Sequence, residues 1–308
     1  MRKVLIAGVL VTAAGATAMG AAIASVGHDD ALSLIQPAGS TESAPQAPKI
    51  PSLKVIGLTG DQRLVAFGSN NPGAVSTLGK VSGLKGDLKL IGIDYRVQNG
   101  KLYGVGNQGG IYTLHTGNAY ATKVSQLTAP LQGTSFGVDF NPAANRLRVI
   151  SDTGQNLRHN IDDPAGAPAA GVTATDGTLT NPPVPPAQTG ATATGVTGAA
   201  YTNNDLDAAT STTLFDLNTT LDQTTLQSPA NAGNLAPAGT LRGDAGPNAG
   251  FDVYYSAANG TNTGYASLRV GSQYRFHRIN LLTGRAIPVG AFPSQRQVVD
   301  VALPLNQG

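Results

Sequence analysis

The stretch GVDFNPAANRLRVISDTGQNLRHN, residues 137–160, is one copy of a repeat that indicates the architecture of the whole chain. An earlier segment, LIGIDYRVQNGKLYGVGNQGGIYTLHTG, aligns with SFGVDFNPAANRLRVISDTGQNLRHNID without a gap at an offset of 45 residues. Gly92 then falls on Gly137, and Asp94 falls on Asp139. Self-similarity of this kind is typical of solenoids, propellers and other arrays of one structural unit.

The signature that opens the repeat, a glycine followed by apolar residues, returns further along the chain. It is found as GAAY at 198–201 and GFDV at 250–253, and a last copy, VDV, stands at 299–301. Segments rich in Val, Tyr and Thr follow each complete copy, and this composition favours strands. A period of about 45 to 60 residues with four short strands per unit is characteristic of propeller blades.

The two ends of the chain complement each other. The N-terminal part contains KVIGLTG, RLVAFGS and AVSTLGKV, which are three predicted strands without an opening signature. The C-terminal VVDVALP is that signature without its three strands. We therefore predict an all-β fold, a five-bladed β-propeller closed by pairing of the N- and C-terminal strands. Closure removes open sheet edges, which suits an exported chain that has no cysteine to form disulfides.

The first residues are typical of a targeting segment. Arg2 and Lys3 precede an apolar run that ends in the small-residue pattern Ala22-Ile23-Ala24. We predict a signal peptide over 1–24, with an uncleaved membrane anchor as the alternative. A flexible Pro/Ala/Ser-rich linker is predicted over 25–51, and a single propeller domain over 52–304.

The Pro-rich stretch 164–195 interrupts the third predicted blade. We expect it to be an insertion that forms a surface loop, with at most one strand near 171–179.

Composition restricts the classes of partner. The net charge is only +2, so there is no electrostatic case for a nucleic-acid or membrane-surface partner. The signal peptide predicts a secreted or extracytoplasmic protein with no stable membrane insertion after cleavage. We expect a monomer whose partner is an unknown ligand or a component of the cell envelope.

The segment GVDFNP…RLRV.SDTGQNLR, with GIDYRVQNGKLYGVG before it and GFDVYY after it, resembles the domain of unknown function family 4394 of exported bacterial proteins. The resemblance covers roughly residues 54–303. It implies a propeller-like fold, and it implies no reaction.

Residues 137–160 carry hydrogen-bonding side chains at positions that are apolar or neutral in the preceding copy of the repeat. At the offset of 45, Arg148 replaces Tyr103, and Asn156 and Arg158 replace Ile111 and Thr113. One interpretation is a buried ion pair between Asp139 and Arg148, which a hairpin turning over 142–145 would place on opposite strands. The other is a cluster that binds a ligand, and its predicted residues are Asp139, Arg148, Asp152, Asn156 and Arg158.

The aspartates of the signature are Asp94, Asp139, Asp252 and Asp300, and they occupy one repeat position. Equivalent strands would carry them around the ring. Converging carboxylates either raise one another's pKa or attract a cation, so a central Ca²⁺ site and a general acid/base pair are both alternatives. The favoured interpretation is that each aspartate bonds groups of its own blade. We therefore predict no cofactor and no metal ligand, with Ca²⁺ as the alternative.

These features favour an exported, non-catalytic propeller that binds a ligand or envelope partner. The alternative is a hydrolase or lyase that acts on an extracellular polymer through axial carboxylates, and a third hypothesis is a purely structural module. GTSFG at 133–137 matches G-x-S-x-G, but Ser135 leads into a strand and not into a helix, so no catalytic residue is predicted. A carboxylate pair open to solvent would support the enzyme, and aspartates occupied by backbone donors would support the binding module.

Overall fold

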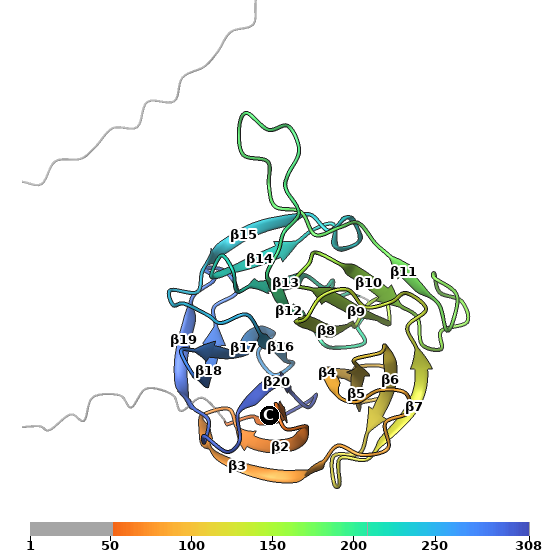
Figure 1. The fold of residues 1–308 in the computed structure, drawn as a ribbon, viewed down its shortest axis with the longest axis vertical. Helices are drawn as coiled ribbons and strands as arrows, with labels where there is room; N and C mark the ends of the chain where they lie inside the picture. Colours follow the sequence, from red (N-terminus) through yellow and green to blue (C-terminus); the bar gives the residue numbers. More distant parts are fainter. Residues whose placement is uncertain (1–51, 208, 308) are drawn as a thin grey trace, which may run out of the picture. The chain divides into compact units, whose positions relative to one another are not determined.

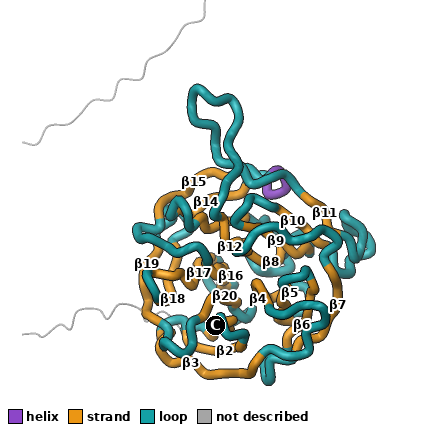
Figure 2. The backbone as a smooth tube through the Cα atoms, in the orientation of Figure 1, coloured by secondary structure: helices purple, strands orange, loops and turns teal. Residues whose placement is uncertain are grey.

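The structure is a computed structural model that describes residues 52–207 and 209–307. The predicted signal peptide 1–24 and linker 25–51 lie outside these residues. The described part of the chain is built from strands, and its one helix is the short η1 (Ala230–Ala232). Figure 2 shows this strand-and-loop composition. None of the helices in this part is long and apolar enough to cross a membrane.

The strands form five four-stranded antiparallel sheets. Blade 1 contains β20 (Val298–Ala302), β1 (Lys54–Thr59), β2 (Arg63–Gly68) and β3 (Asn71–Lys80). Blade 2 contains β4 (Leu90–Arg96), β5 (Lys101–Gly106), β6 (Gly110–Leu114) and β7 (Ala121–Gln126). Blade 3 contains β8 (Phe136–Asn141), β9 (Arg146–Ser151), β10 (Asn156–His159) and β11 (Thr173–Thr175). Blade 4 contains β12 (Val196–Tyr201), β13 (Leu214–Asn218), β14 (Gln223–Gln227) and β15 (Leu235–Thr240). Blade 5 contains β16 (Ala249–Ser256), β17 (Thr261–Val270), β18 (Gln273–Ile279) and β19 (Ala286–Ala291).

The five sheets are arranged as blades around a central axis. Figure 1 shows β20, β4, β8, β12 and β16 nearest the centre and β3, β7, β15 and β19 at the rim. Each inner strand contacts the inner strands of the two neighbouring blades, so the circle is complete. The predicted five-bladed propeller is confirmed.

The ring is closed by the two ends of the chain, as the sequence predicts. Strand β1 pairs with β20 in antiparallel register, with Gly57 opposite Val301 and Leu58 opposite Asp300. The closure requires a glycine at position 57, because a Cβ there would lie 2.7 Å from Cγ1 of Val298. Pairing these strands removes what would otherwise be an open sheet edge next to the axis.

The hairpin of blade 3 has the register that the repeat predicts. Phe140 lies opposite Leu147, and Asp139 lies opposite Arg148. The ring of Phe140 also packs edge-on against Tyr103 of blade 2, with the ring centroids 5.1 Å apart. Contacts of this kind form the core, which fills the space between the apolar faces of adjacent blades.

The Pro-rich stretch 164–195 has two structurally different parts. Its first part contains β11, which pairs with β10 and supplies the outermost strand of blade 3. Leu179, just beyond that strand, is completely buried. The second part, residues 182–189, is exposed, and a loop in this region of the chain projects beyond the ring in Figure 1.

Candidate functional site

Arg148 is the centre of a buried polar network between blades 3 and 4. Its side chain is 2% exposed, and its guanidinium Nη1 donates to Asp176 and to Asn156, each at 2.7 Å. Nη2 donates to the Oδ1 atom of Asn231 at 2.7 Å, and Nε donates to the hydroxyl of Tyr201 at 3.2 Å. Blades 3 and 4 are therefore joined through one side chain.

Asp176, which follows β11, is the carboxylate that neutralises this site. It accepts from Arg148 and also from Nε and Nη2 of Arg158, at 3.0 and 3.1 Å. The predicted ion pair between Asp139 and Arg148 is therefore wrong, although their strands pair as expected. Oδ1 of Asp139 accepts the backbone N–H of Tyr201 at 3.1 Å instead. A register determines which Cα atoms face each other, but a long arginine side chain has several partners within reach.

The structure brings three of the five predicted residues together and leaves Asp139 and Asp152 apart. Arg148 and Arg158 share Asp176, and Asn156 bonds Arg148 directly. Asp152 lies elsewhere, because its carboxylate accepts the backbone N–H and the hydroxyl of Thr134, at 2.9 and 2.6 Å. The ligand-binding role of these residues stays a prediction. The burial and mutual bonding around Arg148 support a structural role in holding two blades together.

Three members of this network were not identified from the sequence. Asp176 lies in the stretch expected to be a surface loop, and Asn231 lies in η1. Tyr201 belongs to the repeat signature. A tyrosine on a buried inner strand usually has a hydrogen-bond partner for its hydroxyl, and this was the available signal in the sequence.

A second carboxylate, Asp216 on β13, is buried near this network. Neither of its oxygens has a hydrogen-bond partner among the described residues. Burial raises the pKa of Asp216 well above its usual range, and the charge of Arg148 acts in the opposite direction.

The aspartates of the repeat form a chain of bonds from blade to blade, and we call Asp94, Asp139, Asp252 and Asp300 the axial carboxylates. Asp300 accepts the N–H of Ile93 at 2.7 Å, Asp94 that of Phe140 at 2.8 Å, Asp139 that of Tyr201 at 3.1 Å, and Asp252 that of Leu303 at 2.6 Å. Each acceptor and its donor belong to neighbouring blades. The expectation that each aspartate bonds groups of its own blade holds in part, because Asp252 also accepts the N–H of Val253 at 2.6 Å, but it missed the four bonds between blades.

The fourth blade interrupts this chain of bonds. Ala200 stands where the other blades have aspartate, so blade 4 has no carboxylate at this position to accept a hydrogen bond from blade 5.

The inner strands approach one another so closely that side chains at the signature glycines would collide. A Cβ at Gly250 would lie 2.4 Å from the Cα of Asp300. The signature glycine is explained by this close approach.

The axial carboxylates lie close together in a poorly solvated environment. Asp94, Asp139 and Asp252 are 5%, 1% and 2% exposed, whereas Asp300 is only half-buried. Burial, together with neighbouring carboxylates, raises the pKa of Asp94 and of Asp139 well above the usual range. Burial raises the pKa of Asp252 to about 6. A polymer substrate has no access to three of these four groups.

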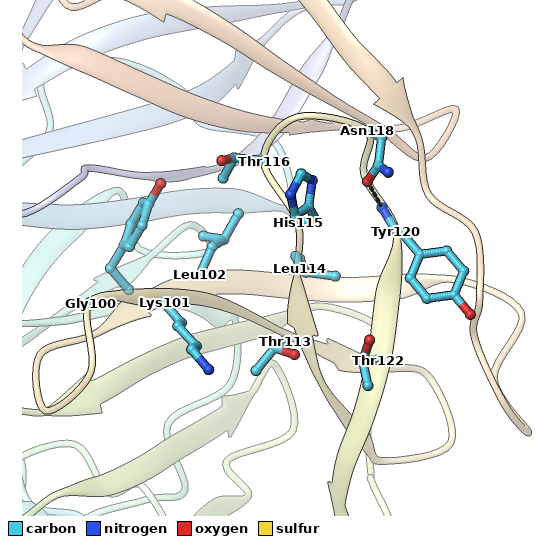
Figure 3. Close-up of a pocket in the computed structure, with 11 residues that line it drawn as sticks. Gly100, Lys101, Leu102, Thr113, Leu114, His115, Thr116, Asn118, Tyr120 and Thr122 are labelled. Carbon is cyan, nitrogen blue, oxygen red and sulfur yellow. Dashed lines mark hydrogen bonds between the residues drawn. The ribbon is translucent and has the colours of Figure 1, made fainter.

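A hollow lies on one face of blade 2, and we call it the blade 2 groove. It has a volume of about 570 Å³ and lies along the β4–β5 and β6–β7 turns. Its lining includes Tyr95, Lys101, Thr113, His115, Tyr120 and Thr122. Figure 3 shows Lys101 on β5, Thr113 on β6 and Thr122 on β7, with His115 and Asn118 at the turn above them.

A second hollow, of about 420 Å³, opens on the same face. It is lined by residues of the β4–β5, β8–β9 and β12–β13 connections, which include Gln98, Pro142 and Asn203. In an antiparallel meander, the turns after the first and third strands lie at one end of the sheet. Both hollows therefore belong to the face where the inner strands β4, β8 and β12 end.

Comparison with known proteins identifies the family of the chain but does not identify an activity. Residues 63–302 match the sequence profile of a family described as Domain of unknown function (DUF4394). No curated protein matches the chain. The fold is similar to a chain in a nidogen/laminin complex, which is 9% identical with a TM-score of 0.45, over 84% of this chain and 100% of that one. It is also similar to a protein of unknown function from Bacteroides thetaiotaomicron, which is 12% identical with a TM-score of 0.45, over 82% of this chain and 65% of that one.

Proposed function

The chain belongs to the family described as Domain of unknown function (DUF4394), and we propose that it is an exported, non-catalytic binding module that holds a carbohydrate at the cell envelope. The ligand is assigned to the blade 2 groove. One contrast carries the proposal: three of the axial carboxylates are buried and closed to a polymer, while the blade 2 groove is lined mainly by uncharged hydrogen-bonding and aromatic side chains.

The burial and the hydrogen bonds of the axial carboxylates argue against a catalytic role for them. A glycosidase needs two carboxyl groups that flank a bound substrate, one to protonate the leaving group and one to act as nucleophile or base. Asp94, Asp139 and Asp252 are buried, and each already accepts at least one backbone N–H. Their function in this proposal is to join blades.

The composition of the blade 2 groove supports an uncharged ligand rich in hydroxyl groups. Lys101 is its one formally charged side chain at neutral pH, and three threonines line it alongside two tyrosines. Tyr120, which is 51% exposed, offers both a flat apolar ring and a hydroxyl. A concave surface with aromatic walls and a few convergent polar groups is typical of small-ligand sites, and a sugar presents both kinds of surface to it.

The proposal is tested by binding of the purified protein to an immobilised panel of bacterial-surface and plant oligosaccharides. We expect retention on at least one saccharide, and about tenfold weaker binding for Tyr120→Ala, since loss of an aromatic contact costs at least about 1.4 kcal/mol. Leu282→Ala is the matched control, because Leu282 is an 88% exposed side chain on blade 5.

Two results would overturn this function. The first is the absence of binding to every saccharide, which would favour a purely structural module. The second is shortening of the bound oligosaccharides, detected by mass spectrometry, which would favour the hydrolase or lyase alternative.

A further inference from the structure

Three of the axial carboxylates form a concentrated acidic site that is not paired with any basic side chain of the described residues. Asp94, Asp139 and Asp252 each offer one carboxylate oxygen, and these oxygens all lie within 4.8 Å of one another. The ion pairs formed by the described residues involve none of the three. Three carboxylates at this separation in a buried environment cannot all remain ionised without a counter-charge.

One carboxylate oxygen of Asp139 has no hydrogen-bond partner in the part of the chain that the structure describes. Oδ1 of Asp139 accepts the N–H of Tyr201, but Oδ2 is buried and accepts no hydrogen bond. Asp139 is 1% exposed, so bulk water does not satisfy this atom. A buried polar atom without a partner is costly and indicates a ligand, an ion or an ordered water.

The spacing of the oxygens fits a calcium-sized ion. Ca²⁺ binds oxygen at roughly 2.3 to 2.6 Å, so two ligand atoms on opposite sides of the ion are about 5 Å apart. Mg²⁺ binds at roughly 2.0 to 2.1 Å and needs opposite ligands about 4 Å apart. The three aspartate oxygens lie within 4.8 Å of one another, which is inside the span of about 5 Å between opposite ligands of Ca²⁺.

The inner strands of the other two blades carry Ala200 and Asp300 at the position of these aspartates. Ala200 contributes only a methyl group at the equivalent position of blade 4. Asp300, the fourth axial carboxylate, is half-buried and lies on β20, beside the closure of the ring. Hard cations commonly complete their coordination with water and additional carboxylates.

We propose that a divalent cation of the Ca²⁺ class binds on the propeller axis between Asp94, Asp139 and Asp252. The ion joins the inner strands of blades 2, 3 and 5, which are not linked by pairing to one another. It replaces repulsion among the carboxylates with a common attraction, so binding favours the closed ring. This inference is independent of the blade 2 groove and of its carbohydrate.

The experiment measures bound metal directly. The full chain is unfolded in guanidinium with EDTA, refolded with Ca²⁺ under excess Mg²⁺, passed through a desalting column and analysed by elemental mass spectrometry. We expect about one Ca²⁺ per chain, as for a single coordination site, and a higher melting temperature than for protein refolded in EDTA.

Two variants locate the ion. Asp139→Asn keeps an acceptor for the N–H of Tyr201 but removes the free carboxylate oxygen, and it should lower the Ca²⁺ affinity by more than about tenfold. Asp207→Asn is the matched control, because Asp207 is exposed, lies in the acidic turn NNDLD at 203–207 and should leave the metal content unchanged when it is replaced.

Three outcomes would overturn the proposal. Wild-type protein that refolds without retaining Ca²⁺ would show that shared protons satisfy the cluster, and this result decides the question even if a variant does not fold. Full metal content in folded Asp139→Asn would place the ion elsewhere. Loss of metal in Asp207→Asn would assign it to the exposed turn.

Discussion

Replacing Asp176 with asparagine should destabilise the propeller far more than the loss of any surface carboxylate. The change preserves the shape of the side chain but removes the one charge that is paired with Arg148, whose side chain is 2% exposed. Asn156, Asn231 and Tyr201 remain as neutral partners for the guanidinium. A buried cation is then left without a counter-charge.

The size of the loss in unfolding free energy follows from the burial of the ion pair between Asp176 and Arg148. Breaking a buried ion pair by removing one partner costs about 3 to 5 kcal/mol. The second pair, with Arg158, adds little because that side chain is 23% exposed and solvent screens it. We therefore expect a loss of about 3 to 4 kcal/mol in the free energy of unfolding, and a fall of roughly 10 °C in melting temperature for a domain of this size.

The assay is urea unfolding at pH 7, followed by circular dichroism, on a double-mutant cycle of Asp176→Asn and Arg148→Met. The coupling energy should be about 2 kcal/mol or more, because the two side chains are in direct contact. Asp61→Asn is the control, because its pair with Arg63 is exposed and should contribute less than about 1 kcal/mol. Additive losses in the cycle, or a cost for Asp176→Asn as small as that of the control, would refute the assignment of Asp176 as the partner of Arg148.

Three further predictions concern closure, the projecting loop and pH. Deleting residues 298–307 should abolish cooperative thermal unfolding, because β1 would lose β20 and expose backbone groups next to the axis; a sharp transition at the wild-type temperature would contradict this. Replacing the exposed residues 182–189 with Gly-Ser should change the free energy of unfolding by less than about 1 kcal/mol, given the weak length dependence of loop closure, and a larger loss in urea unfolding would show that the loop stabilises the ring. Burial lowers the pKa of His159 from 6.5 to about 4, so the unfolded chain binds a proton in this window that the folded chain does not. Stability that is present above pH 6.5 should therefore decline as the pH falls toward 4, and His159→Gln should lose this part of the pH dependence in melting experiments.

The partners of the polar residues show where prediction from the sequence ends. The repeat correctly predicts that Asp139 lies opposite Arg148, because the register of a hairpin follows from the local pattern of turn and strand residues. It does not predict that Arg148 bonds Asp176 and Asn231, which come from a Pro-rich stretch and from η1. Neither segment belongs to the repeat, so alignment of the copies contains no information about them.

The architecture itself was determined by the sequence alone. The repeated glycine signature specifies the number of blades, and the incomplete copies at the two ends specify that β20 closes the ring with β1. These features are local and periodic, so each strand and each copy of the repeat can be recognised from its own segment of the sequence. Only the tertiary structure decided that the axial carboxylates accept backbone N–H groups of the next blade and that three of them, Asp94, Asp139 and Asp252, converge within 4.8 Å. The physical reason is that the distance between side chains of different blades depends on how closely the closed ring brings the inner strands together, and no single segment encodes that distance.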